Sequence, residues 1–195
     1  MNDVTSIGNA FLLYNKELKS LNINKVEKIG DNFLGFSRCS LIKSINFPKL
    51  EIIGKGFMLF CEQGIEEIYL PNVKSIGDEF CRYLRRGIEI LDFPNLESMG
   101  EWFMYELDGV SYINIPKIIK LSSFFLSTNQ AFITKLNLDN CKYIGRSVMT
   151  RSNVDLNNAN LNNVEKIEKS FLTFSDTNSD VINMPKVESI ANNVL

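Results

Sequence analysis

The stretch IEEIYLPNVKSIGDEF, residues 65–80, decides the fold because near-copies of it occur along the chain. FPNLESMGEWF at 93–103 and FPKLEIIGKGF at 47–57 are two of them. Self-similarity at a fixed period of about 20–50 residues is the signature of a repeat architecture. The sequence therefore predicts one structural unit that is repeated, and the fold has to be argued from that unit.

The repeats are aligned on the apolar residue that begins each glycine turn, and its successive members stand 22 to 24 residues apart: Ile7, Ile29, Ile53, Ile76, Met99, Leu121, Ile144, Ile167 and Ile190. Four residues after each of these stands an apolar residue, in most repeats a phenylalanine: Phe11, Phe33, Phe57, Phe80, Phe103, Phe125, Val148, Phe171 and Val194. All five prolines share one further register position. We expect a single solenoid over residues 4–195, with eight repeats of about 23 residues and a partial ninth.

The first half of the unit reads as a strand. In residues 65–71, Ile68 and Leu70 alternate with Glu67 and Tyr69, which is the period of two that is typical of a half-buried strand. Pro71 has no N–H to donate to a ladder, so it fits the end of that strand. We expect Ile68 and Leu70 to face the core and their neighbours to face outward.

The second half of the unit reads as a turn. Val73 and Ile76 are expected to point inward, and Gly77 allows a tight turn that a Cβ would block. Phe80 and Tyr83 stand three residues apart, a spacing that predicts a single helical or 3-10 turn. One such coil has a single apolar edge, which only stacking against neighbouring coils can bury.

The repeated unit resembles the BspA-like leucine-rich repeats of bacterial surface and secreted proteins, whose unit reads L-x-x-I-x-L-P…V-x-x-I-G-x-x-A-F. The resemblance covers residues 4–195 and implies an α/β repeat solenoid. In such a solenoid the L-x-x-I-x-L strands form a parallel β-sheet on the concave face, and short helical or 3-10 turns lie on the convex side. Ser122, Glu168 and Ala191 depart from the family's glycine. A parallel β-helix is the alternative architecture, and the Phe-x-x-aromatic turn argues against it.

Composition excludes several classes of function. The net charge of −2 gives no reason to expect nucleic acid as a partner, and no run approaches the ~18 apolar residues of a membrane span. The chain has no histidine, which removes the usual general base and the commonest metal ligand. We therefore predict no enzymatic activity, no cofactor and no metal. The four cysteines, Cys39, Cys61, Cys81 and Cys141, are interpreted as small buried hydrophobes.

The predicted concave strands present two outward columns of side chains. The later column reads Asn22, Asn46, Tyr69, Asp92, Asn114, Asn137, Asn160, Asn183, and its asparagines predict a ladder of amides bonded along the solenoid. The earlier column contains Glu67, Ile90 and Tyr112. Aromatic and apolar groups rimmed by carboxylates have the composition of a protein-binding hot spot, so the candidate partner-binding residues are Glu67, Tyr69, Ile90, Asp92 and Tyr112. The alternative is that the tyrosines only shield the sheet.

Two features lie outside those strands. Arg82, Arg85 and Arg86 form either a patch for an anion or acidic partner or an ordinary solvated surface, and the second interpretation is favoured. Trp102 is either an exposed anchor or a cover for the convex turn.

The leading functional prediction is a non-catalytic module that binds a protein partner through its concave sheet. The resemblance implies a cell-surface or secreted bacterial protein of adhesin or effector type, with a host protein among the partners, although no signal peptide is visible. The alternative is a structural or substrate-recognition arm of a larger protein. Neither end has a polar cap, which points to a longer protein or to end-to-end self-association.

Overall fold

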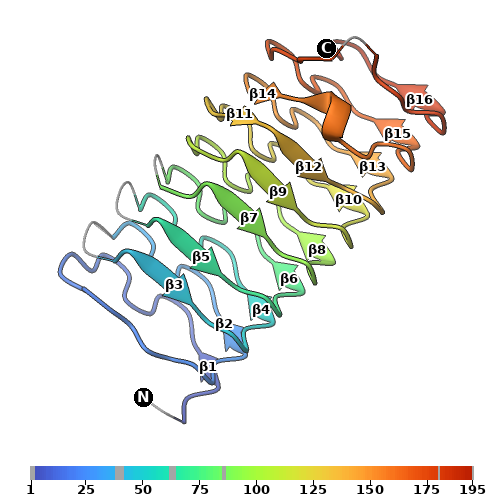
Figure 1. Cartoon of the computed structure of the whole chain (residues 1–195). Coiled ribbons are helices and arrows are strands. Elements are labelled where there is room, and N and C mark those ends of the chain that lie inside the picture. Colours follow the sequence, from blue (N-terminus) through green and yellow to red (C-terminus); the bar gives the residue numbers. More distant parts are fainter. Residues whose placement is uncertain (1–2, 38–41, 62–64, 85–86, 180, 195) are drawn as a thin grey trace.

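In the computed structural model the chain winds into a stack of similar coils, and each coil adds strands to parallel ladders that run along the stack (Figure 1). The structure describes residues 3–37, 42–61, 65–84, 87–179 and 181–194. The termini lie at opposite ends of the stack (Figure 1). The repeat solenoid predicted from the sequence is therefore the observed architecture.

One ladder is made of two-residue strands, one from each glycine turn. Its first five strands form one sheet: β1 (Ser6–Ile7), β2 (Lys28–Ile29), β4 (Ile52–Ile53), β6 (Ser75–Ile76) and β8 (Ser98–Met99). Four more form a second sheet: β10 (Lys120–Leu121), β13 (Tyr143–Ile144), β15 (Lys166–Ile167) and β16 (Ser189–Ile190). Every pair is parallel, and Ile53 lies opposite Ile29 and Ile76. The repeat period thus becomes the strand register.

A second ladder is made of the three-residue strands that were predicted for the concave sheet. They are β3 (Ser44–Asn46), β5 (Glu67–Tyr69), β7 (Ile90–Asp92), β9 (Tyr112–Asn114) and β12 (Lys135–Asn137). The middle residue of each strand is buried and its two neighbours point outward. We call their outward side the long-strand face. A further short pair, β11 (Phe132–Ile133) and β14 (Asn153–Val154), lies beside this ladder.

The core is a column of phenylalanines surrounded by Ile, Leu and Val. Phe80 is fully buried, and its ring stacks between those of Phe57 and Phe103 at centroid distances of 5.2 and 5.0 Å. Phe93 meets Phe80 edge-on at 6.0 Å. The inward assignment of Ile68, Leu70, Val73 and Ile76 is confirmed, since each of them is buried.

The prediction of helical or 3-10 turns on the convex side is wrong. Within the described ranges the one helical element is η2 (Leu156–Asn158), which lies outside the aromatic turns. In those turns φ is positive at alternate residues, as at Glu79, Cys81 and Tyr83 with φ of 60°, 49° and 62°. The i, i+3 spacing of the aromatic residues therefore does not arise from a helix.

The neighbouring coils explain this backbone. The N–H of Glu79 donates to the carbonyl of Glu101 on the next coil, whereas the N–H of Cys81 donates to Phe57 on the preceding coil. Placing a non-glycine residue at positive φ costs about 1–2 kcal/mol. Each inter-coil hydrogen bond stabilises the fold by about 0.5–1.5 kcal/mol, which offsets that cost. Stacking of the aromatic rings between coils stabilises the turn further. The turn therefore keeps this backbone conformation instead of forming a helix.

Close approach between coils also gives the repeated glycine its reason. A Cβ on Gly77 would lie 2.7 Å from the backbone nitrogen of Lys55 and 2.8 Å from the carbonyl carbon of Gly54. The φ of Gly77 is not positive, so space rather than a special conformation requires the glycine. At Gly87 both reasons apply, because its φ is +122° and a Cβ there would also lie against the backbone of Ile65.

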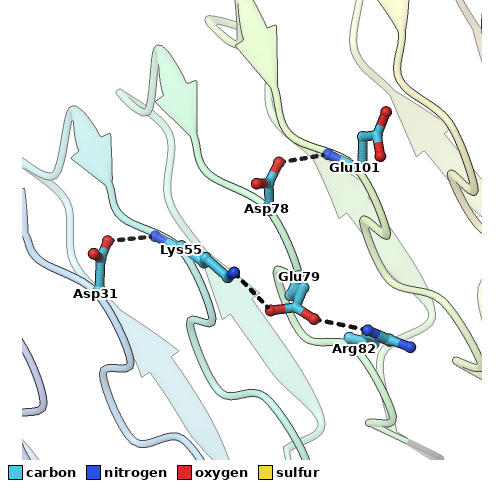
Figure 2. A network of polar contacts seen from close by, with 6 residues as sticks. All are labelled: Asp31, Lys55, Asp78, Glu79, Arg82 and Glu101. Carbon is cyan, nitrogen blue, oxygen red and sulfur yellow. Dashed lines mark hydrogen bonds and ion pairs between the residues drawn. The ribbon is translucent and has the colours of Figure 1, made fainter.

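Asparagine and aspartate side chains join successive coils. Asn72 and Asn95 donate to the carbonyls of Pro48 and Pro71 on the preceding coils, at 2.7 and 2.9 Å. In the glycine turn, Asp31 accepts from the N–H of Lys55 at 2.8 Å and Asp78 accepts from that of Glu101 at 2.9 Å (Figure 2). These bonds lock each coil in register with the next.

The described cysteines are buried, as expected. Cys81 and Cys141 are free thiols. Cys61 is also buried, but it is disulfide-bonded, which the sequence spacing did not predict. Cys39 lies outside the described residues.

Candidate interaction surface

The five predicted binding residues all lie on the long-strand face. Glu67 and Tyr69 flank Ile68 on β5, Ile90 and Asp92 flank Leu91 on β7, and Tyr112 begins β9. Tyr69 and Ile90 are 50% and 55% exposed, which is high for side chains of their size, and Glu67 and Asp92 are exposed as well. Tyr112 is half-buried.

Strand register sets the neighbours on this face. β7 and β9 are paired so that Ile90 lies beside Tyr112 and Asp92 beside Asn114. β3 and β5 are paired so that Asn46 lies beside Tyr69. The sequence period brings these side chains into two columns because strands one repeat apart are stacked about 4.8 Å from each other.

The predicted amide ladder exists over part of the later column. Asn137 donates to Oδ1 of Asn114 at 2.8 Å, and Asn114 donates to Oδ1 of Asp92 at 2.7 Å. Asn160 leaves the column, since its amide donates to Asp139 instead. The ladder therefore holds one oxygen of the Asp92 carboxylate, and the described residues donate no hydrogen bond to the other.

Negative charge gathers around β5 and β7. Glu66 is paired with Lys43 at 2.6 Å, but Glu67, Glu89 and Asp92 form no ion pair within the described part of the chain. A positive charge lies further along the same face, on β12. The ammonium of Lys135 is 5.0 Å from the ring centroid of Tyr112. A depression of about 290 Å³ lies beside this charge, lined by Ser44, Ile45, Asn46, Glu67 and Tyr69.

The ladder of three-residue strands is interrupted between β5 and β7. β3 and β5 form one sheet, and β7, β9 and β12 form another. Elsewhere the residue before the strand donates to the preceding coil, as Glu66 does to Lys43 and Ser111 to Glu89, but the described residues show no such bond from Glu89 to Glu66. We call this interruption the β5–β7 seam. Nothing in the repeat spacing predicted it.

A separate cluster of rings and charges lies on the aromatic turns. Arg82 donates to Glu79 at 2.7 Å, and Glu79 also faces Lys55 at 3.7 Å (Figure 2). The guanidinium lies over the rings of Tyr83, Trp102 and Tyr105, at 4.8, 4.3 and 5.6 Å from their centroids. Arg82 is thus not a solvated charge. Arg85 and Arg86 of the same predicted patch lie outside the described residues.

Trp102 takes the second of the two roles predicted for it. Its ring stacks on Phe124 at 3.8 Å with planes 8° apart and meets Tyr105 edge-on at 5.0 Å. With Arg82 above it, the indole is half-buried and covers the turns of neighbouring coils.

A second depression, of about 300 Å³, was missed by sequence reasoning. It lies along the strands β10, β13 and β15 and the residues that directly follow them, and it is lined by Lys120, Tyr143, Ile144, Gly145, Lys166 and Glu168. Nearby, a hydrogen bond from Lys142 at 2.8 Å lowers the pKa of Glu165 and raises that of Lys142. The signal was available, since Lys120, Tyr143 and Lys166 share one register position in consecutive repeats.

Within residues 3–37, 42–61, 65–84, 87–179 and 181–194, no three His, Cys, Asp or Glu side chains are grouped so as to hold a metal ion. The same residues form no helix that is long and apolar enough to cross a membrane. Burial raises the pKa of the Cys81 thiol well above its ordinary value and that of Cys141 to about 11, which makes both of them poor nucleophiles.

Comparison with known proteins gave one result. The family model described as BspA type leucine rich repeat region matches residues 1–85 and 74–195, with 6 copies of the repeat. No curated protein and no solved structure matched the chain.

Proposed function

The chain belongs to the family of BspA type leucine rich repeats, and from this premise we propose that it is a non-catalytic module that binds a protein partner through the long-strand face. Leucine-rich repeats are interaction scaffolds, and their coils hold a sheet rigid at little conformational cost on binding. We further propose that it belongs to a bacterial cell-surface or secreted protein of adhesin or effector type, with a host protein among its partners. This finer assignment follows from the family resemblance alone.

The observation that carries the binding proposal is the exposure of Tyr69 and Ile90 on adjacent coils, beside the carboxylates of Glu67 and Asp92. Large apolar side chains on a rigid surface, surrounded by polar groups, provide the anchors of protein interfaces. Tyr112 extends the same patch onto β9.

The test is a quantitative pull-down from a host-cell lysate, with the wild-type chain compared with the double variant Tyr69→Ala/Tyr112→Ala. The matched control is Tyr143→Ala, which removes a tyrosine that is 41% exposed on the other ladder. We expect specific partners to be lost by the double variant and kept by the control. Identical partner sets for all three proteins would refute binding through this face.

A second candidate function is assembly by stacking of coils. Ile190 is 57% exposed, whereas Ile167 at the same register position is 1% exposed. That difference supports a role for the β16 surface in contacting a second copy of the chain. If copies associate there, Ile190→Glu should abolish a concentration-dependent oligomer in sedimentation velocity, and an unchanged distribution would remove this alternative.

A further inference from the structure

We propose that the long-strand face binds an extended partner segment that carries a lysine or arginine next to an apolar side chain, and that this segment docks across the β5–β7 seam. The inference rests on the proposed function, because it specifies the chemistry of the partner for the same face. Three independent features of the described residues support it.

The first feature is uncompensated negative charge. Some carboxylates on the solenoid have cationic partners, as Glu51 has Lys74 at 3.1 Å and Glu165 has Lys142 at 2.8 Å. Glu67 and Asp92 lie on the two sides of the seam, and neither has an ion pair in the described part of the chain. A cation between them would be attracted by both, and an acidic partner would be repelled.

The second feature is the apolar surface between those charges. Tyr69 and Ile90 are half exposed or more, one on each side of the seam. Lysine and arginine lay their aliphatic stems along such surface while the charged head reaches a carboxylate. The face itself contains an example, since the Lys135 ammonium lies 5.0 Å from the centroid of the Tyr112 ring.

The third feature is the open backbone of the seam. On other coils the N–H after the strand donates to the following coil, as from Phe47 to Tyr69 and from Phe93 to Asn114. The described residues show no equivalent bond from Leu70 to Asp92, but Leu70 is fully buried. The backbone that a partner can reach at the seam is that of the exposed residue Glu89, whose N–H has no bond to Glu66 within the described residues. Backbone groups that have lost a ladder partner need another donor or acceptor, and a peptide segment or a guanidinium fork supplies one. These groups fix where along the face the segment docks.

The test uses a phage-displayed library of random dodecamers, selected on the wild-type chain and counter-selected on Tyr69→Ala/Tyr112→Ala. Enriched sequences are synthesised and titrated against the wild-type chain, Glu67→Gln/Asp92→Asn and a control, Glu27→Gln/Glu97→Gln. The control removes two exposed carboxylates at the other ladder. Circular dichroism verifies that all variants are folded.

We expect the enriched peptides to carry a lysine or arginine beside an apolar residue, and their binding to weaken with added salt. Glu67→Gln/Asp92→Asn should weaken binding about tenfold, the combined effect of two exposed charge pairs, and the control should leave it unchanged. Peptides that depend on Tyr69 but carry no cation, or that ignore the carboxylate variant, would overturn this inference and leave the proposed function standing. The absence of any peptide that depends on Tyr69 and Tyr112 would overturn both.

Discussion

The guanidinium of Arg82 lies 4.3 Å from the ring centroid of Trp102, a residue that belongs to the next coil. The same guanidinium is paired with Glu79 at 2.7 Å, and both side chains are about one-fifth exposed, at 20% and 19%. Arg82 thus links two coils through its planar face and neutralises a carboxylate that is largely withdrawn from water. A charged side chain on the surface of one repeat becomes part of the packing between repeats.

Replacing Arg82 with alanine should therefore lower the free energy of unfolding by about 1–3 kcal/mol, because Glu79 loses its closest cation and Trp102 loses its cover. Within the described part of the chain the Nε of Arg82 is buried without a hydrogen-bond partner, so part of the arginine is not satisfied. Arg82→Met, which keeps the packing on Trp102, should cost less than Arg82→Ala. Urea unfolding followed by circular dichroism measures both.

Arg151→Ala is the control, because Arg151 lies 5.8 Å from the ring of Phe174, which is 79% exposed. Its effect should stay within about 0.5 kcal/mol. Equal losses for Arg82→Ala and Arg151→Ala would show that the contact with Trp102 contributes nothing.

Core and surface positions of one repeat should respond very differently to truncation. Phe80→Ala should cost about 3–5 kcal/mol, because Phe80 is fully buried between two stacked rings and its loss leaves a cavity. Glu67→Ala should change stability by no more than about 0.5 kcal/mol, because Glu67 is exposed. Similar midpoints for the two variants in denaturant titrations would contradict the inward and outward assignment.

The glycine of the repeat should tolerate alanine only where no coil lies against it. Gly77→Ala should destabilise by about 1–3 kcal/mol, since its new Cβ would meet backbone atoms of the preceding coil at 2.7 and 2.8 Å. A Cβ on Gly8 would have nothing within 4 Å, so Gly8→Ala should be neutral or slightly stabilising. Thermal unfolding of the two variants tests this, and a neutral Gly77→Ala would mean that the coils separate at little cost.

Stability should fall at alkaline pH through the buried thiols. Burial raises the pKa of Cys141 to about 11, and a thiol in the unfolded chain has a pKa of about 8.5. Between these values the unfolded state releases its proton first, so the free energy of unfolding decreases as pH rises from about 8.5 to about 11. Below that range both states hold the proton and the effect vanishes.

Cys141→Ala isolates this contribution. The difference in unfolding free energy between wild type and variant should shrink across the same pH interval, as urea titrations at pH 8, 9.5 and 11 would measure. A difference that stays constant with pH would show that Cys141 titrates normally in the folded protein.

The sequence by itself determined the solenoid, the strand register and the direction of the side chains. A 23-residue period stacks equivalent residues on one another, and alternation within Glu67–Tyr69 decides that Ile68 faces the core. It also placed Tyr69, Ile90 and Asp92 on one exposed face. The alternation of residues within a strand predicts which face a side chain lies on and nothing further. Their role in binding stays a prediction.

Only the tertiary structure decided the features that arise from contacts between neighbouring coils. The aromatic turn was predicted as helical because the spacing of Phe80 and Tyr83 suits a helix, but the hydrogen bonds of Glu79 and Cys81 go to adjacent coils instead. The contact of Arg82 with Trp102, the space around Gly77 and the interruption between β5 and β7 likewise arise between repeats. The physical reason is that a repeat specifies its own apolar edge, while the distance and partners offered by the next repeat are set only when the coils stack.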